Sequence, residues 1–441
     1  MSHYIKKVLY LLTLVGGVFL GLFGLKAEEL TIDITQGTIA PMPVAITSFY
    51  GASPELANLG TQISSIVSAD LKGCGLFKPL DPSSFVQTLD SLRQQGPRFA
   101  DWRLINTQTL VKGDITLMND GRFRVEFRLY DVIAENQMEG LAFMATAQDY
   151  RRVAHKIADA IYKRITGDEG YFDTKIAYVS QTGPSTKRIK RLAIMDQDGA
   201  NHRFLSTGQS LVLTPRFSPK AQEIAYIDFN HIQPKVYMMN LSSGQRQLLG
   251  NFKGMTFAPH FSPDGSSVIM SFAAGGRTSL YNMNLGTRAI ARITEGAQID
   301  TSPCYSPDGN QIVFNSDRGG SAQLYVMPAR GGDAERISFG KGSYRTPVWS
   351  PRGDWITFTK LSKGSFYIGV MKPDGSGERL LAQGYVIDDP CWSPNGRVIM
   401  FTRLERTGKS RMYAVDLTGY NERVIPTPTD AAGGCWSPLI R

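Results

Sequence analysis

The sequence predicts a mainly β protein, in which an N-terminal α/β domain precedes a six-bladed β-propeller. A motif of one aromatic residue followed by Ser-Pro recurs six times, at intervals of 43 or 44 residues. A second marker, a methionine in five of its six copies, repeats every 44 residues. Short β-branched runs lie between the markers, so each unit holds about four short strands, as a propeller blade does. The signature serines are Ser218, Ser262, Ser306, Ser350, Ser393 and Ser437.

The first residues predict a secretory signal. Two lysines precede an uncharged run from Val8 to Gly24, and the small residue Ala27 comes before a polar segment. This pattern is typical of a signal peptide, here over residues 1–27. The run also approaches the length of a membrane span, so an uncleaved anchor is the competing interpretation. We expect cleavage after Ala27 and a soluble, exported mature protein.

Residues 28–165 lack the repeat and combine helix and strand signals. Ser53 and Pro54 suit the N-cap and first position of a helix that runs to about Lys72. A second helix begins at Tyr150, has one apolar face, and ends at Gly167. These signals predict a compact α/β domain. Its strands are expected at Pro41–Tyr50, Thr109–Met118, Arg122–Val132 and Glu139–Ala147.

The repeat also predicts how the ring closes. Three strands without a signature precede the first signature, and no strand follows the last one. We therefore expect residues 431–437 to form the innermost strand of the blade built from residues 175–207, which leaves no free sheet edge. The propeller then spans residues 175–441, after a linker over residues 166–174. The three strands without a signature lie near Ile176, Leu192 and Phe204.

Charge and motifs exclude several classes of function. The formal net charge is +9, but three of the lysines lie in the leader, and the densest basic stretch is only "TKRIKR". Nucleic acid is therefore not an expected partner. The sequence has no G-x-S-x-G nucleophile elbow, no histidine spacing typical of a metal site and no phosphate-binding glycine loop. We expect no catalytic residues, no cofactor and no metal ion.

One group of potential ligands occupies equivalent positions on different blades. His260, Cys304, Cys391 and Cys435 each stand two residues before a signature serine. A metal ring around the channel is one interpretation, and packing between blades is the other. Side chains on adjacent blades are expected to lie too far apart for a disulfide or for metal–sulfur bonds of about 2.3 Å. We therefore favour packing and expect four free thiols, Cys74 included.

Five prolines and a glycine stand three residues before the signature serines. We expect them to stiffen the loops that lead into the innermost strands, at one end of the channel. Rigid loops on a rigid scaffold favour a recognition surface there. The alternative is that proline only ends the preceding loop. The six residues are Pro215, Pro259, Pro303, Pro347, Pro390 and Gly434.

Several features together resemble the TolB family of the Tol–Pal cell-envelope system of Gram-negative bacteria. They are the leader, "LTIDITQGTIAPMPVAITSF" after it, "TKIAYVS" at the start of the propeller, the six signatures, and an ending just after "WSP". The resemblance implies a periplasmic, non-catalytic and monomeric adaptor that supports outer-membrane integrity and envelope constriction at cell division. It also implies two protein partners, the lipoprotein Pal and the inner-membrane tether TolA, and only indirect contact with membranes.

The resemblance assigns one site to each partner. Pal is expected at the propeller mouth, where Met255 stands in place of a usual histidine and Ser302 in place of a usual acidic residue. TolA is expected to engage a mobile N-terminal arm over residues 28–37. The expected Pal residues are Met255, Ala258, Thr301, Ser302, Thr346 and Asp389. The expected TolA residues are Glu28, Glu29, Leu30, Thr31, Ile32, Asp33 and Ile34.

The alternative function is an exported enzyme that acts on a polysaccharide or peptide at the channel mouth. Such an enzyme would need clustered carboxylates. Asp388 and Asp389 form the only adjacent acidic pair before a signature. We interpret them as solvated loop charges.

Overall fold

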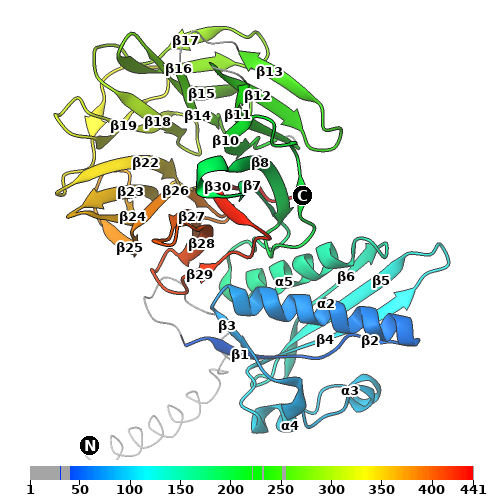
Figure 1. The fold of residues 1–441 in the computed structure, drawn as a ribbon. Helices are drawn as coiled ribbons and strands as arrows, with labels where there is room; N and C mark the ends of the chain where they lie inside the picture. Colours follow the sequence, from blue (N-terminus) through cyan, green and yellow to red (C-terminus); the bar gives the residue numbers. More distant parts are fainter. Residues whose placement is uncertain (1–29, 31–39, 221, 231–232, 251–254, 441) are drawn as a thin grey trace, which may run out of the picture.

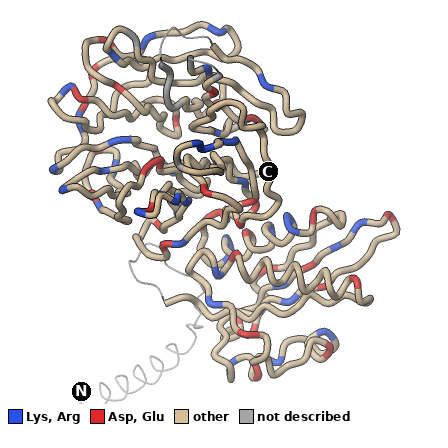
Figure 2. Tube along the Cα trace, in the orientation of Figure 1, with Lys and Arg blue, Asp and Glu red and all other residues tan. Residues whose placement is uncertain are grey.

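The computed structural model describes residues 30, 40–220, 222–230, 233–250 and 255–440 of the chain. An α/β domain and a propeller lie side by side, with strand β30 of the C-terminus next to β7 (Figure 1). Acidic and basic residues are interspersed over both parts (Figure 2). Among the described residues, no helix combines the length and the apolar character that crossing a membrane requires.

The α/β domain is one six-stranded sheet with helices on both faces. Helices α2 (Pro54–Gly73) and α5 (Tyr150–Thr166) share the main core with one face, and α3 (Leu89–Gln95) and α4 (Phe99–Leu104) pack on the other. The strand order is β3 (Phe77–Pro79), β1 (Met42–Ile46), β4 (Thr109–Leu117), β5 (Phe123–Asp131) and β6 (Asn136–Ala145), and β2 (Tyr50–Gly51) pairs with β4.

The helix ends follow the sequence signals. The Ser53 hydroxyl accepts the Leu56 N–H at 3.3 Å, and Gly167 ends α5 at a φ of 76°, which favours glycine. The single strand expected over residues 41–50 is wrong, because the chain breaks after β1. There the Thr47 N–H bonds to the Val111 carbonyl at 3.0 Å, before the short strand β2 begins.

The propeller consists of six four-stranded antiparallel sheets, as predicted. Blade 1 is β10 (Leu211–Phe217), β11 (Glu223–Asn230), β12 (Gln233–Asn240) and β13 (Arg246–Gly250). Blade 2 is β14 (Met255–Phe261), β15 (Ser267–Ala274), β16 (Arg277–Asn284) and β17 (Ile290–Arg292). Blade 3 is β18 (Asp300–Tyr305), β19 (Gln311–Ser316), β20 (Gln323–Pro328) and β21 (Glu335–Arg336).

The remaining blades follow the same order from the channel outwards. Blade 4 is β22 (Ser343–Trp349), β23 (Ile356–Ser362), β24 (Ser365–Met371) and β25 (Arg379–Gly384). Blade 5 is β26 (Val386–Trp392), β27 (Val398–Leu404), β28 (Ser410–Asp416) and β29 (Arg423–Val424). The closing blade is β30 (Asp430–Trp436), β7 (Lys175–Thr182), β8 (Ile189–Asp196) and β9 (Arg203–Phe204).

The closure predicted from the repeat count is confirmed. Strand β30 pairs antiparallel with β7, in a register that sets Trp436 opposite Ile176. The Ser437 N–H then donates to the Lys175 carbonyl at 2.8 Å, and the Ser437 hydroxyl accepts the Lys175 N–H at 3.0 Å. The first and last strands of the propeller therefore form one sheet.

The signature serines stabilise the turns after the innermost strands. In blade 2 the Ser262 hydroxyl accepts the Ser267 N–H at 3.0 Å and donates to Asp264 Oδ1 at 2.5 Å. In blade 5 the Ser393 hydroxyl accepts the Val398 N–H at 3.0 Å. At these turns the buried serine hydroxyl accepts a backbone N–H that the strand ladder leaves unpaired. We call the end of the channel where these turns lie the signature end.

The α/β domain docks on the signature end of the propeller. Asp168 pairs with Arg352 at 2.9 Å and with Arg397 at 2.6 Å, both on or beside signature turns. Tyr171 and Phe172, in the expected linker, are buried in a core cluster that continues into blade 5 and the closing blade. Residues 166–174 therefore pack between the two parts.

Candidate functional site

The innermost strand of every blade contains a β-bulge. The register with the second strand shifts just before each signature. The residue four positions before the signature serine has positive φ on five blades: 48° at Thr214, 54° at Ser302, 45° at Thr346, 55° at Asp389 and 60° at Gly433. Ala258 holds the same sequence position on the sixth blade. We call these six residues the bulge ring.

The position of the bulges corrects the expectation for the prolines. The five prolines and Gly434 lie inside the innermost strands, directly after the bulge ring, and not in the loops that precede the strands. Proline lacks the N–H that a strand ladder uses, so it is tolerated where a bulge interrupts the ladder. Positive φ costs about 1–3 kcal/mol for a residue other than glycine, and such strain gathers at functional sites. Four members of the described ring carry a side chain at this cost.

Hydrogen bonds between adjacent blades fix the bulge ring. The Ser302 N–H donates to Ser271 Oγ of blade 2 at 3.2 Å. The Gly433 N–H donates to Thr402 Oγ1 of blade 5 at 2.8 Å. These two bulges are thereby held by hydroxyls of the preceding blades. The ring is a preorganised backbone surface.

Asp388 also holds a bulge in place, and its position corrects a second expectation. It lies in β26 and is not a solvated loop charge. Its Oδ1 accepts Thr346 Oγ1 at 2.8 Å, Thr359 Oγ1 at 2.9 Å and the Asp389 N–H at 2.8 Å. The carboxylate therefore ties blade 4 to the bulge of blade 5.

Asp389 supplies an acidic group within the bulge ring. Burial raises the pKa of this carboxyl to about 6, and the neighbouring charge of Asp388 acts in the same direction. Arg216 and Lys190 oppose this shift. A side chain at Gly433 would lie 3.8 Å from Asp389 Oδ2, so the carboxylate faces the neighbouring bulge.

Three positions before the bulge ring in the sequence, apolar residues lie at or just before the start of the innermost strands. Leu211 and Ile299, each seven positions before a signature serine, are 39% and 47% exposed. Met255 holds the same position on the blade between them. Phe339 and Tyr385, on the loops into β22 and β26, are also exposed. We call Leu211, Ile299, Phe339 and Tyr385 the apolar rim.

The structure brings most of the expected Pal residues to this surface. Ser302, Thr346 and Asp389 belong to the bulge ring, and Thr301 precedes Ser302 in β18. Met255 and Ala258 lie on β14, and their side chains are outside the described part of the chain. Sequence reasoning missed Thr214, Leu211 and Ile299, although their constant distance from the signature serine could have identified them.

The expected arm is described only at Leu30. This side chain is partly buried against the core cluster that the α/β domain shares with the propeller. Glu28, Glu29 and residues 31–34 lie outside the described residues, as does the predicted leader over residues 1–27.

The signature end of the channel holds a cavity of about 800 Å³. Six side chains, each two positions before a signature serine, are among those that line it. Arg216 Nε donates to His260 Nε2 at 3.1 Å, and the Trp436 N–H donates to Cys391 Sγ at 3.3 Å. Side chains at this position therefore contact one another across adjacent blades, and the four cysteines are free thiols, as expected. The six residues are Arg216, His260, Cys304, Val348, Cys391 and Cys435.

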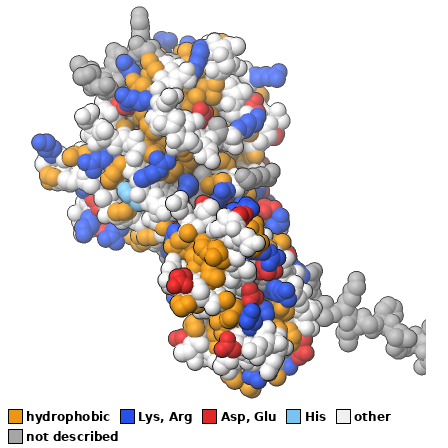
Figure 3. Space-filling view, turned by 90° about the vertical axis from the view of Figure 1, so that its right-hand side faces the viewer, with side chains coloured by type: hydrophobic (Ala, Val, Ile, Leu, Met, Phe, Trp, Pro, Cys, Tyr) orange, Lys and Arg blue, Asp and Glu red, His pale blue; other side chains and the backbone are white. Residues whose placement is uncertain are grey.

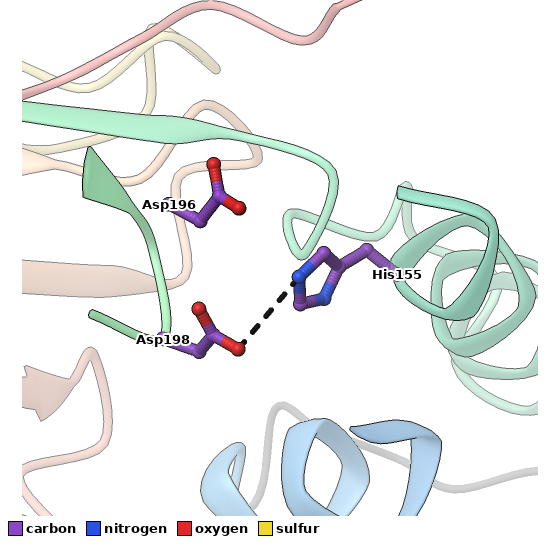
Figure 4. Close-up of side chains that lie close together, drawn as sticks. All are labelled: His155, Asp196 and Asp198. Atoms are coloured by element: carbon purple, nitrogen blue, oxygen red, sulfur yellow. Dashed lines mark ion pairs between the residues drawn. The ribbon is translucent and has the colours of Figure 1, made fainter. Parts of the chain in front are cut away.

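A buried polar cluster joins the α/β domain to the closing blade (Figure 4). His155 of α5 bonds through Nδ1 to Asp70 Oδ2 at 2.6 Å, and its Nε2 lies 3.8 Å from Asp198 Oδ2. His155, Asp196 and Asp198 offer ligand atoms within 4.8 Å of one another, a geometry that a metal ion could use.

Existing partners of the two carboxylates argue for an ion-pair network in place of a metal site. Asp196 pairs with Lys175 at 2.7 Å and accepts Asn201 Nδ2 at 2.6 Å. Asp198 pairs with Arg151 and accepts the Ala200 N–H at 3.0 Å. The positive charge that the carboxylates need is therefore already present. The cluster holds the two parts of the molecule together.

Apolar side chains also gather on the face of the α/β domain turned to the viewer in Figure 3. The exposed large apolar residues of this domain include Leu117, Met118, Leu141 and Met144. This domain docks at the signature end, so these residues are remote from the bulge ring.

Comparisons with known proteins agree with this architecture. The family model described as the TolB beta propeller domain matches residues 162–440, and the one described as the TolB amino-terminal domain matches residues 30–138. The Tol-Pal system protein TolB of Paramagnetospirillum magneticum is 56% identical over 224 residues. That alignment covers 51% of this chain and 50% of the relative, so it spans about half the length of each protein.

Solved structures extend the comparison to nearly the whole chain. The crystal structure of TolB from Acinetobacter baumannii matches with a TM-score of 0.82 and 28% identity, over 91% of this chain and 97% of that one. A nidogen/laminin complex matches 61% of this chain and 100% of that one with a TM-score of 0.50 and 8% identity, a likeness of fold alone. Because the propeller model matches well over half of the sequence, the chain belongs to the TolB family.

Proposed function

We propose that this protein is a non-catalytic periplasmic adaptor of the Tol–Pal system, and that the bulge ring and apolar rim bind the lipoprotein Pal. The observation that carries the proposal is the ring of strained bulges, of which those at Ser302 and Gly433 are fixed by hydrogen bonds between blades before any partner arrives. A preorganised surface loses little conformational entropy on binding. The family membership and the Tol-Pal name of the curated relative support the choice of system.

The composition of the surface suits a protein partner. An apolar rim beside hydroxyl groups and one half-buried carboxylate combines hydrophobic contact with a few directed polar contacts. An enzyme at the same place would need a carboxylate free to transfer protons. The Asp388 carboxylate already accepts three hydrogen bonds. Within this acidic pair, Asp389 is therefore the one carboxylate left to transfer protons.

We further propose that residues 28–37 engage TolA and that Pal binding changes whether this arm packs on the core. Leu30 lies against the core shared by both parts of the molecule, so its release would expose the arm. An order–disorder change of one segment is a known way to couple two binding sites. Through these two contacts the adaptor would support outer-membrane integrity and envelope constriction at cell division.

Calorimetric titration with purified Pal from the same source tests the mouth site. Ala258→Arg and Thr301→Arg should each weaken binding about tenfold or more, because a long charged side chain blocks the bulge ring. Ala291→Arg is the matched control, since Ala291 is exposed on β17, the outermost strand of the same blade as Ala258. Unchanged affinity in both ring variants would exclude this surface.

Deletion of residues 28–37 tests the arm separately. The shortened protein should lose binding to purified TolA and should keep the melting temperature of the α/β domain and propeller. Retained TolA affinity would refute the assignment of the arm. Because coupling between two sites is reciprocal, the deletion should change Pal affinity, and unchanged Pal affinity in the same sample would refute the coupling while leaving the mouth site itself in place.

A further inference from the structure

Two thiols meet at the seam where the ring closes. Cys391 lies on β26 of blade 5 and Cys435 on β30 of the closing blade, both two residues before a signature serine. The Trp436 N–H donates to Cys391 Sγ at 3.3 Å. The sulfur of Cys391 therefore lies against the residue that follows Cys435. Both cysteines are free thiols in the structure.

The surroundings of the pair give its two members different roles. The hydrogen bond from Cys391 lowers the pKa of Cys435 to about 7, and the positive charge of Arg216 acts in the same direction against the effect of burial. The same hydrogen bond, together with burial, raises the pKa of Cys391 well above its usual range. Thiolates are the reactive form of cysteine, so the lowered pKa favours Cys435 as the attacking thiol and Cys391 as the resolving one.

The other two cysteines of the chain lack this environment. Cys304 holds the equivalent position on blade 3, where the positions on the adjoining blades carry His260 and Val348. Burial raises the pKa of the Cys304 thiol to about 11 and that of Cys74 to about 12. Cys304 also lines the cavity, so it is a control with the same access but no thiol neighbour.

We propose that Cys391 and Cys435 are a dithiol pair that small disulfides convert to an intramolecular disulfide, which links blade 5 covalently to the C-terminal strand. The Cys435 thiolate attacks one sulfur of the oxidant, forms a mixed disulfide and expels a thiolate. Cys391 then gives its proton to solvent and attacks Cys435 Sγ, which expels the second thiolate. The protein loses two electrons and two protons, and the oxidant disulfide becomes two thiols.

The disulfide would join blade 5 to the C-terminal strand, which the fold otherwise holds together by noncovalent contacts. Strand β30 is joined to β7 by backbone hydrogen bonds, and to blade 5 by packing and by hydrogen bonds such as that from the Gly433 N–H to Thr402 Oγ1. A disulfide from Cys391 to Cys435 encloses the rest of blade 5 and restrains the C-terminal strand in the unfolded chain as well. The inference rests on the channel geometry and is independent of the proposed partners.

Bis(2-hydroxyethyl) disulfide added to the reduced, folded, full-length protein tests the proposal by intact-mass spectrometry after an acid quench. The wild-type chain and Cys304→Ser should each lose two hydrogens, and peptide mapping should recover the Cys391–Cys435 link. Cys391→Ser should stop at the mixed disulfide and gain one hydroxyethylthio group. Cys391→Ala should do the same if the serine variant folds poorly.

Two outcomes would overturn the proposal. One is a wild-type chain that reacts only after unfolding. The other is a wild-type chain that keeps the hydroxyethylthio adduct without forming the internal disulfide.

Discussion

The indole Nε1 of Trp436 donates a hydrogen bond to Thr174 Oγ1 at 2.9 Å. This bond joins the end of the last propeller strand to the residue just before the first one. The Trp436 ring also meets Tyr171 edge to face, with centroids 5.7 Å apart. The C-terminal strand therefore stabilises both the ring closure and the contact with the α/β domain, so changes at Trp436 should affect both.

Substitution of Trp436 tests this double role. Trp436→Phe keeps an aromatic ring but removes the donor to Thr174, so we expect a loss of about 1–2 kcal/mol in the free energy of unfolding, measured with urea. Trp355→Phe, at a partly exposed tryptophan of blade 4, is the control and should change stability little. Thr174→Val also removes the bond from Thr174 Oγ1 to the Tyr171 carbonyl at 2.6 Å, so the double variant should lose more than Trp436→Phe alone but less than the sum of the two single losses. Additive losses would show that the bond contributes nothing of its own.

Truncation tests the closure itself. Removal of residues 431–441 deletes nearly all of β30 and exposes the edge of β7, so the protein should aggregate or unfold in size-exclusion chromatography. Removal of residues 440–441 leaves β30 and its bonds to Lys175 intact, and the melting temperature should change little. Equal melting temperatures for the long truncation and the full chain would contradict a structural role for the last strand.

Local and regularly repeated features are the ones that the sequence predicts well. Ser53 and Gly167 act on their own helix ends, and the signature serines repeat at a nearly constant spacing, so both signals are readable without tertiary structure. The bulges, by contrast, depend on hydroxyls of the preceding blade, such as Ser271 and Thr402. No residue close in sequence to Ser302 or Gly433 indicates that the N–H of the bulge bonds to a hydroxyl of the preceding blade.

Contacts across the ring and between the domains escaped prediction for the same reason. Trp436 shares a cluster with Met400 of blade 5, but its hydrogen bond and ring contact are with the segment before β7, which the repeat does not predict. The thiol pair depends on how narrow the channel is at Cys391 and Cys435, a distance that repeat spacing does not determine. Long-range geometry of this kind is visible only in the folded chain.

The His155 cluster should make the stability of the molecule depend on pH. Burial opposes the charged imidazole, but the hydrogen bond and charge of Asp70, with the charges of Asp198 and Asp196, outweigh it and raise the pKa of His155 above 6.5. A raised pKa in the folded state contributes stability that is present below pH 6.5 and is lost as pH rises through the folded-state pKa. Arg151 and Lys175 also face the cluster, where they pair with Asp198 and Asp196.

The comparison of wild type with His155→Gln isolates this contribution. Glutamine can still donate to Asp70 but carries no charge, so the difference in melting temperature should be larger at pH 5.5 than at pH 8.5. His202→Gln is the control, because burial lowers the pKa of that histidine and gives no stabilisation by protonation. A difference that grows with pH would have the wrong sign and would exclude a protonated His155 in the folded protein.

The bulge ring carries strain that one substitution should release. Thr214 has a φ of 48°, and its buried hydroxyl has no hydrogen-bond partner among the described residues. Thr214→Gly removes the strained Cβ and the unpaired hydroxyl, so we expect the protein to gain about 1 kcal/mol in its free energy of unfolding. Gly433→Ala introduces the same strain at a φ of 60° and should cost about 1 kcal/mol, as there is space for the methyl group.

The pair of variants also separates stability from recognition. If the strained ring is retained for Pal binding, Thr214→Gly should be more stable and should bind Pal more weakly, because a glycine bulge is less rigid before binding. Urea unfolding and calorimetric titration of the same two samples measure both quantities. A Thr214→Gly variant that loses stability would show that the positive φ is not a source of strain.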